Sequence, residues 1–192
     1  MEKQLSNKKV AILVADGFEE SEFTKPLEAL REASAQVEVI SLHDGKVRAW
    51  NEKDWGGEYP VDKTIDQANS KDYDALVLPG GVLNPDQLRM NADAVAFVGG
   101  FFDDSKPIAA ICHGPWTLIE TGELTGRQMT SYPSLKTDLT NAGAQWVDKE
   151  VVVDNGLVTS RKPDDLEAFN KKMIEELAEG QHATTGQFTN TK

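Results

Sequence analysis

The chain has 192 residues, which suits one domain of ordinary size, and its 39% apolar content is that of a globular protein and not of a disordered one. The formal net charge of −12 repels phosphate backbones and anionic lipid, so stable binding to nucleic acid or to a membrane surface is not expected. The one cysteine, Cys112, excludes an intrachain disulfide and a multi-cysteine metal site, and it favours a reducing, cytoplasmic location.

The first half of the chain alternates predicted strands with a predicted helix. Residues 10–15 form a short continuous apolar run, which is typical of a strand buried on both faces. Apolar side chains recur every three or four residues over 21–35, which predicts an amphipathic helix, and a second strand follows at 37–40. A polar and aromatic stretch, 46–60, precedes the third predicted strand at 73–78.

The second half continues this alternation. A helical stretch is predicted at 85–104 and a strand at 108–112, and the next helix begins near Gly114 or Pro115. The remaining predicted elements are short strands at 129–131 and 146–147, a hairpin of 151–154 and 157–160 about Asn155-Gly156, and a helix from 163 or 164 to 178. The pattern predicts an α/β fold, a doubly wound sandwich with a mostly parallel sheet.

The sequence predicts one domain over residues 1–178, with its core at about 8–178. Residues 179–192 are small, polar and aperiodic, so we expect a disordered tail there. No apolar run reaches the length of a signal-peptide core or of a membrane span. We therefore expect neither export nor membrane insertion.

Cys112 stands where a predicted strand turns sharply into a helix. The run Ala110-Ile-Cys-His-Gly114 has the spacing of a nucleophile elbow, with alanine in place of the first glycine. A turn at the carboxyl edge of a parallel sheet projects its side chain into the ligand cleft. We expect the N-terminus of the following helix to lower the pKa of the Cys112 thiol and make it reactive. The alternative is a buried, inert core cysteine.

Two other segments are expected at the same edge of the sheet. Pro79-Gly80-Gly81 follows a strand, and its N–H groups with that of His113 could form an oxyanion hole; the alternative is a plain turn. Glu19, Glu20 and Glu22 follow the first strand. A carboxyl there could hydrogen-bond the sulfur or move protons with a raised pKa, or these residues could simply complement the helix dipole.

The remaining histidines and tryptophans give weaker signals. His43 and His182 have no partners at metal-ligand spacing, so we predict no metal site. The chain has no dinucleotide-binding or Walker-type glycine pattern, so no cofactor is expected. Trp50 and Trp55 could line the cleft, form a subunit contact or pack locally.

Taken together, these segments resemble the PfpI family, which includes intracellular protease I and general stress proteins and belongs to the superfamily of the parkinsonism-associated protein deglycase. The resemblance covers about residues 8–178. It is carried, in chain order, by residues 18–22, 74–81, 110–115, 141–144, 150–154 and 158–166. It implies a flavodoxin-like domain that assembles as a homodimer or a higher oligomer.

The resemblance also implies roles for single residues. Cys112 would be the nucleophile and an oxidation-sensitive thiol, with His113 as its base partner. Glu22 would be the protonated carboxyl that hydrogen-bonds the cysteine, and Glu19 a second acidic residue of the pocket. Gly81 and the amide of His113 would form the oxyanion hole.

In the proteolytic branch of this family, a glutamate from the neighbouring subunit orients the histidine. Here the corresponding place holds Asp86, in a loop that is one residue longer. The shorter side chain in a longer loop argues against a working peptidase triad. Relatives also often carry a smaller polar residue at the position of Trp116.

Three chemistries suit a reactive thiol at this elbow. Attack on reactive carbonyls or their protein adducts would give glyoxalase or deglycase activity, and attack on a peptide bond would give a cysteine peptidase. Reaction with peroxide would give a redox sensor or scavenger, or a redox-regulated chaperone without turnover. We favour a stress-response enzyme acting on carbonyls or their protein adducts, with a cysteine that oxidises readily.

Overall fold

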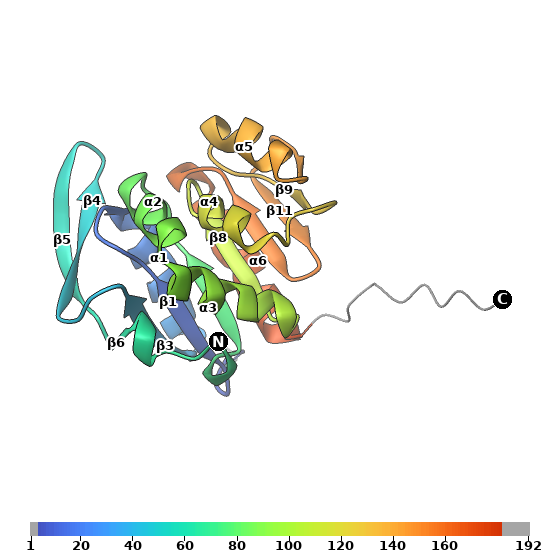
Figure 1. The fold of residues 1–192 in the computed structure, drawn as a ribbon. Coiled ribbons are helices and arrows are strands. Elements are labelled where there is room, and N and C mark those ends of the chain that lie inside the picture. The colour runs from blue at the N-terminus through green and yellow to red at the C-terminus, as the bar shows by residue number, and fades with distance from the viewer. Residues whose placement is uncertain (1–3, 182–192) are drawn as a thin grey trace.

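A seven-stranded sheet forms the centre of the protein, and the computed structural model describes residues 4–181 (Figure 1). Its strands follow the order β11 (Val151–Asp154), β12 (Leu157–Ser160), β8 (Ile108–Ile111), β7 (Ala75–Leu78), β1 (Lys9–Leu13), β3 (Gln36–Ser41) and β6 (Lys63–Thr64). Neighbouring strands are parallel except for the antiparallel pair of β11 and β12. The carboxyl ends of β1, β7 and β8 therefore lie side by side.

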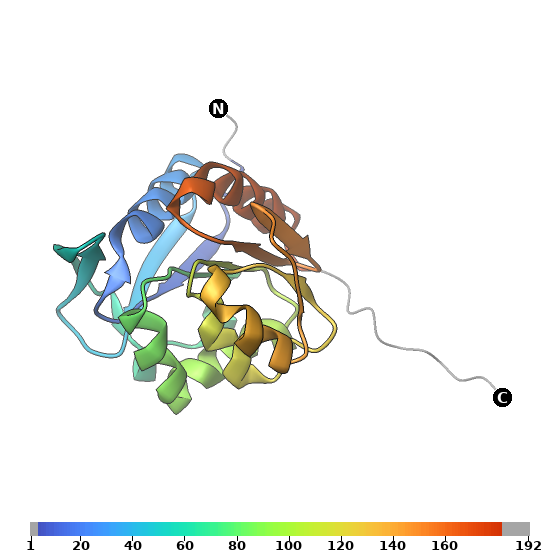
Figure 2. The same ribbon diagram turned by 90° about the horizontal axis from the view of Figure 1, so that it is seen from above.

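Helices cover both faces of this sheet (Figure 2). One face carries α1 (Glu20–Glu32) and α6 (Leu166–Glu179). The other carries α2 (Leu83–Met90), α3 (Ala92–Asp103), α4 (Pro115–Leu118) and α5 (Lys136–Asn141). This arrangement confirms the predicted doubly wound, flavodoxin-like α/β fold with a mostly parallel sheet.

The two layers of helices explain why the central strands are apolar throughout. In β1, Val10 and Ile12 pack into the core under α1 and α6, whereas Ala11 and Leu13 pack into the core on the opposite face. All four side chains are fully buried. A strand covered on both faces gains from an apolar residue at every position, which is the pattern that predicted it.

The stretch 46–60 forms a β-hairpin, which the sequence analysis treated only as a polar and aromatic excursion. Strands β4 (Lys46–Asn51) and β5 (Asp54–Pro60) pair with each other, and β4 also pairs with the short β2 (Phe18–Glu19). The turn places Glu52 at a φ of 54°. Trp50 and Trp55 face each other across the hairpin with ring centroids 5.6 Å apart. The hairpin stands beside the first strand end, next to the candidate site.

The helical stretch predicted at 85–104 is two helices, α2 and α3. The chain leaves helical geometry at Asn91, whose side chain accepts a hydrogen bond of 2.9 Å from the N–H of Ala94. Asparagine is a favoured N-cap, so this residue ends one helix and begins the next. The predicted hairpin about Asn155-Gly156 is present, with positive φ at both residues as its turn requires.

Short elements complete the chain. Strands β9 (Gln128–Met129) and β10 (Gln145–Trp146) pair in parallel, near the two short strands predicted. Within residues 4–181, 3-10 segments span Ile65–Gln67, Ser70–Asp72, Ile119–Thr121, Pro133–Leu135 and Pro163–Asp165.

Among residues 4–181, every helix is too short or too polar to span a membrane. Most of the predicted tail, residues 182–192 with His182, lies outside the described residues. A single domain over residues 1–178 remains our proposal, supported by the one continuous central sheet.

Candidate active site

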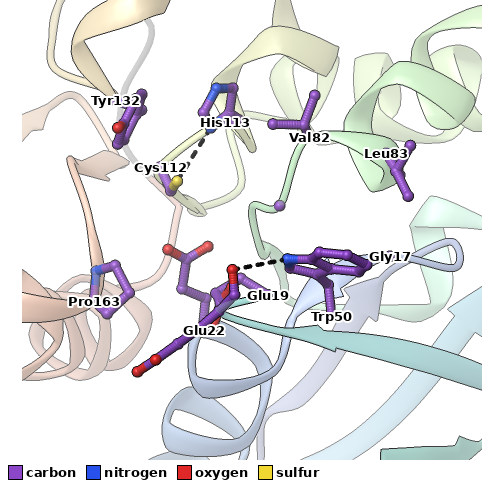
Figure 3. Close-up of a pocket in the computed structure, with 12 residues that line it drawn as sticks. Gly17, Glu19, Glu22, Trp50, Val82, Leu83, Cys112, His113, Tyr132 and Pro163 are labelled. Carbon is purple, nitrogen blue, oxygen red and sulfur yellow. Dashed lines mark hydrogen bonds between the residues drawn. The ribbon is translucent and has the colours of Figure 1, made fainter. Parts of the chain in front are cut away.

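A pocket of about 580 Å³ opens where β1, β7 and β8 end (Figure 3). The sequence predicted that segments following these strands would meet at one edge of the sheet. Its lining residues are Gly17, Glu19, Glu22, Trp50, Glu52, Gly81, Val82, Leu83, Cys112, His113, Tyr132 and Pro163. The pocket therefore contains the predicted cysteine, histidine, glycine and two of the predicted glutamates.

Cys112 sits in the turn between β8 and α4 with a φ of 61°, in the left-handed region that residues with side chains rarely adopt. Two hydrogen bonds hold this strained backbone: its N–H donates to the carbonyl of Ser160 at 3.0 Å, and its carbonyl accepts from the N–H of Tyr132 at 2.8 Å. Such strain persists only where surrounding contacts impose it. The turn leaves the side chain at the base of the pocket, 7% exposed.

Glycines allow the backbone to approach this cysteine closely. A Cβ on Gly80 would lie 2.4 Å from Oε2 of Glu22 and 2.7 Å from Cβ of Cys112. At Gly81, φ is 78° and a Cβ would lie 2.3 Å from the carbonyl oxygen of Gly17. Side chains are therefore excluded at both positions. The N–H groups of Gly81 and His113 both interact with the Cys112 sulfur, so the two predicted oxyanion-hole donors are side by side.

Glu22 is fully buried on the first turn of α1, with its carboxyl directed toward Cys112 (Figure 3). Oε2 accepts a hydrogen bond of 2.9 Å from the N–H of Gly80. Burial raises the pKa of the Glu22 carboxyl to about 8, because the charged form loses its hydration; the negative charge of Glu19 adds to the rise. The carboxyl therefore holds a proton at neutral pH, next to the sulfur.

The predicted direction of the Cys112 pKa is wrong. Burial raises the pKa of the thiol, and ionisation of the adjacent Glu22 carboxyl would raise it further, while the N–H groups of Gly81 and His113 lower it by less. The predicted helix effect is weak because α4 has only four residues, Pro115–Leu118, before the chain tightens into a 3-10 turn. The Cys112 thiol is therefore protonated at rest.

Three neighbouring residues contact the imidazole ring of His113. Its Nδ1 lies 3.2 Å from the Cys112 sulfur, its Nε2 lies 3.2 Å from Oγ of Ser134, and its ring stacks on Tyr132 with centroids 4.7 Å apart. Burial lowers the pKa of the His113 ring, so it is neutral at pH 7. Neither Ser134 nor Tyr132 was expected from the sequence, because nothing local to them points to a histidine about 20 residues earlier.

The other candidates divide between the pocket and the surface. Glu19 lines the pocket, and burial raises the pKa of its carboxyl. Trp50 and Glu52 line it from the hairpin, which makes the cleft interpretation of Trp50 correct. Asp86 is exposed on α2 and is not part of the lining. Trp116 is not part of the lining either, and the guanidinium carbon of Arg89 lies 4.7 Å from the centroid of its ring.

The described residues offer no group of three or more His, Cys, Asp or Glu side chains placed to hold a metal ion. The pocket lining combines acidic and apolar side chains and includes neither lysine nor arginine. The groups that the pocket offers are thus a thiol, an imidazole, a protonated carboxyl and backbone N–H groups.

The chain belongs to the DJ-1/PfpI family, whose pattern matches residues 8–176. General stress protein 18 of Bacillus subtilis is 47% identical over 168 residues, covering 87% of this chain and 96% of the relative. YraA of the same organism is 45% identical over 168 residues, covering 88% of this chain and 97% of the relative, and carries a provisional cysteine-protease name.

Protein/nucleic acid deglycase 2 of Escherichia coli is 43% identical over 169 residues, covering 88% of this chain and 96% of the relative. Among solved structures, DJ-1beta of Drosophila melanogaster is similar with a TM-score of 0.80 and 34% identity, covering 89% of this chain and 90% of that one. The fold and the family-level expectation from the sequence are thereby confirmed.

Proposed function

We propose that the protein acts on small reactive carbonyls or their protein adducts, as a glyoxalase or deglycase, with Cys112 as the nucleophile. The observation that carries this proposal is the protonated Glu22 carboxyl beside the Cys112 sulfur. Carbonyl addition needs a proton donor for the new oxygen, and a carboxyl with a pKa near 8 holds its proton at neutral pH. Relatives named for deglycation and for stress response support the same chemistry.

The first step is addition of the sulfur to the carbonyl carbon. The Cys112 thiol gives its proton to Nδ1 of His113, a carbon–sulfur bond forms, and the carbonyl π electrons move to oxygen. The N–H groups of Gly81 and His113 stabilise that oxygen while Glu22 protonates it. The product is a thiohemiacetal, with Glu22 left as a carboxylate.

For a dicarbonyl such as methylglyoxal, the remaining steps need only water. The Glu22 carboxylate takes the proton from the carbon bonded to sulfur and delivers it to the neighbouring carbon. The hydroxyl proton of the first carbon passes through His113 to the oxygen of the second, so the thiohemiacetal becomes a thioester. The extra proton on His113 then returns to Glu22. Water then hydrolyses the thioester, releasing a hydroxy acid and restoring the Cys112 thiol. One carbon is oxidised and its neighbour reduced, so no external oxidant or cofactor takes part.

The test is methylglyoxal consumption by the wild-type protein and by Cys112→Ser. We expect the variant to fall to the rate of the uncatalysed reaction, because a serine hydroxyl at this site lacks a base strong enough to activate it. Circular dichroism controls for folding. Equal rates of methylglyoxal consumption by the two proteins would refute the carbonyl hypothesis.

A cysteine peptidase is the second candidate, and the 3.2 Å contact between the Cys112 sulfur and His113 favours it. A triad would need Asp86 from a neighbouring subunit, since Asp86 of the same chain is exposed on α2 and outside the pocket lining. Peptide hydrolysis that Asp86→Ala abolishes would support the peptidase over the deglycase. The homodimer or higher oligomer itself is a proposal, checked by sedimentation velocity.

The third candidate is a redox-regulated chaperone or sensor without turnover. We also propose that Cys112 oxidises readily once its proton has passed to His113. We further propose that the protein works in the cytoplasm, where its lone thiol stays reduced between oxidation events. Suppression of aggregation that is unchanged in Cys112→Ser would favour a chaperone.

A further inference from the structure

We propose that Ser134 is a positioning residue that holds the His113 ring with Nδ1 facing the Cys112 sulfur. This inference rests on the proposed function only in that Cys112 is the reacting group. Nε2 of His113 lies 3.2 Å from Oγ of Ser134, on the side of the ring away from the sulfur. The two contacts use both ring nitrogens, so each fixes the orientation that the other requires.

The segment 131–135 is tied to the elbow independently of this contact. The N–H of Tyr132 donates to the carbonyl of Cys112 at 2.8 Å, and Leu135 is buried in the core. The hydroxyl of Ser131 donates to the Tyr132 carbonyl and accepts from Nε1 of Trp146 at 3.0 Å. The Ser134 hydroxyl is therefore carried by a fixed backbone, although the side chain itself is exposed.

A hydroxyl suits a ring that is neutral at rest. Serine both donates and accepts, so it can bond Nε2 whether or not that nitrogen carries the proton. When the thiol donates to Nδ1, Nε2–H donates to Ser134; when Nδ1–H faces a thiolate, the Ser134 hydroxyl donates to Nε2. Each tautomer has both nitrogens satisfied without a charged imidazolium at rest.

A carboxylate at this place would act differently, because its negative charge would favour the imidazolium. Within residues 4–181, the ring nitrogens of His113 bond only the Cys112 sulfur and Ser134. Together with the burial that lowers the pKa of the ring, this makes His113 a neutral hydrogen-bonding partner of the sulfur at rest. Ser134 thus occupies, within one chain, the orienting place that the peptidase hypothesis gives to Asp86.

The test measures Cys112 reactivity directly, so it does not depend on turnover of any carbonyl. Iodoacetamide alkylates the thiol: a carbon–sulfur bond forms, the carbon–iodine bond breaks, iodide leaves and the thiol proton passes to solvent. Cys112 is the one cysteine, so the rate belongs to it. We expect Ser134→Ala to lower the rate roughly two- to ten-fold, the value of one hydrogen bond. Ser134→Thr, which keeps the hydroxyl, should restore it.

Thr140→Ala is the matched control, because it removes an exposed hydroxyl that bonds only the backbone of α5, at Lys136. It should leave the alkylation rate unchanged. Ring ¹⁵N chemical shifts of His113 supply a second readout, and Ser134→Ala should change the balance of Nδ1–H and Nε2–H tautomers while Thr140→Ala should not.

An alkylation rate and ring shifts in Ser134→Ala equal to wild type would overturn the inference. A slower alkylation with altered ring shifts, in a protein whose wild type consumes no methylglyoxal, would support the role of Ser134 and refute the proposed function. The two ideas therefore fail separately.

Discussion

Cys112, Glu22 and His113 form a site in which burial determines the protonation states more than neighbouring charges do. Desolvation raises the pKa of the Glu22 carboxyl and of the Cys112 thiol, and it lowers the pKa of the His113 ring. All three groups are consequently neutral near pH 7. In the proposed mechanism, the thiol reaches its reactive state by passing its proton to His113 across the 3.2 Å contact between sulfur and imidazole.

Substituting Glu22 by glutamine tests the role of its proton. Glutamine has the shape of the protonated carboxyl and can still accept from the N–H of Gly80, but it cannot give up a proton. We expect Glu22→Gln to remain folded and to consume methylglyoxal roughly 100- to 10,000-fold more slowly. An unchanged rate would remove Glu22 from the mechanism.

We also expect Glu22→Gln to change how the free energy of unfolding depends on pH. The folded-state pKa of Glu22, about 8, lies above its ordinary value of 4.5, so between these values the folded protein binds more protons than the unfolded chain. The stabilisation is complete below pH 4.5 and is lost as pH rises through 8. As pH rises through this window, the free energy of unfolding of the wild type should fall by up to about 1.4 kcal/mol per pH unit relative to that of Glu22→Gln.

Chemical denaturation of both proteins from pH 5 to 9 measures this difference. The comparison with Glu22→Gln is needed because the lowered pKa of His113 acts in the opposite direction, adding stability as pH rises toward 6.5. Parallel curves for the two proteins would contradict the raised pKa.

At the scale of elements, α1 carries two neighbouring glutamates with different tasks. Glu22 points into the pocket, whereas Glu20 binds the hairpin of β4 and β5. Oε1 of Glu20 accepts from the N–H of Gly57 and the hydroxyl of Tyr59 at 2.8 and 2.7 Å, and Oε2 accepts from Nδ2 of Asn51 at 2.8 Å. These bonds lower the pKa of the Glu20 carboxyl, so it anchors the hairpin as a carboxylate.

We expect Glu20→Ala to loosen the hairpin that brings Trp50 and Glu52 to the pocket. Amide hydrogen exchange over residues 46–60 should accelerate, with a local loss of roughly 1 kcal/mol because the bonds are partly exposed to water. KM for the carbonyl substrate should rise more than kcat falls.

Glu28→Ala is the control for this prediction, because Glu28 lies on the same helix in an exposed ion pair with Lys25, and such pairs contribute little. It should leave exchange in the hairpin unchanged. Equal exchange in Glu20→Ala and wild type would show that the strand pairing alone holds the hairpin.

At the scale of the whole molecule, the net charge is −12, and the pocket lining holds Glu19 and Glu52 beside the protonated Glu22, with neither lysine nor arginine. A phosphate-bearing ligand would meet repulsion both on approach and in the pocket. Although one relative is named a protein/nucleic acid deglycase, this charge distribution favours uncharged carbonyls and protein adducts.

We therefore predict no measurable binding to duplex DNA at physiological ionic strength. Fluorescence anisotropy of a labelled 20-base-pair duplex, titrated with the protein, is the measurement. Binding that weakens steeply with added salt would reveal phosphate contacts and contradict the prediction.

The outline of the fold and the centre of the site were accessible from the sequence. Apolar runs identify strands buried on both faces, and the residues that follow each strand lie at one edge of a parallel sheet. That reasoning placed Cys112, the turn at 79–81 and the glutamates of 19–22 at this edge, because their positions follow from local turns. The resemblance to the PfpI family singled out Gly81 and Glu22. The break at Asn91 was missed because its neighbours on either side are helical in pattern.

Contacts between distant segments were decided only by the tertiary structure. Ser134 reaches the His113 ring from a 3-10 segment, and Trp50 reaches the pocket from a hairpin. The local sequence of these two segments gives no indication that they lie near Cys112. The direction of the thiol pKa also reversed, because it depends on burial and on the Glu22 carboxyl, both products of packing. The sequence by itself determined where the lone cysteine sits along the chain and that it stands at a strand end. Only the folded chain decided its protonation and its neighbours, because electrostatics depend on distance through space.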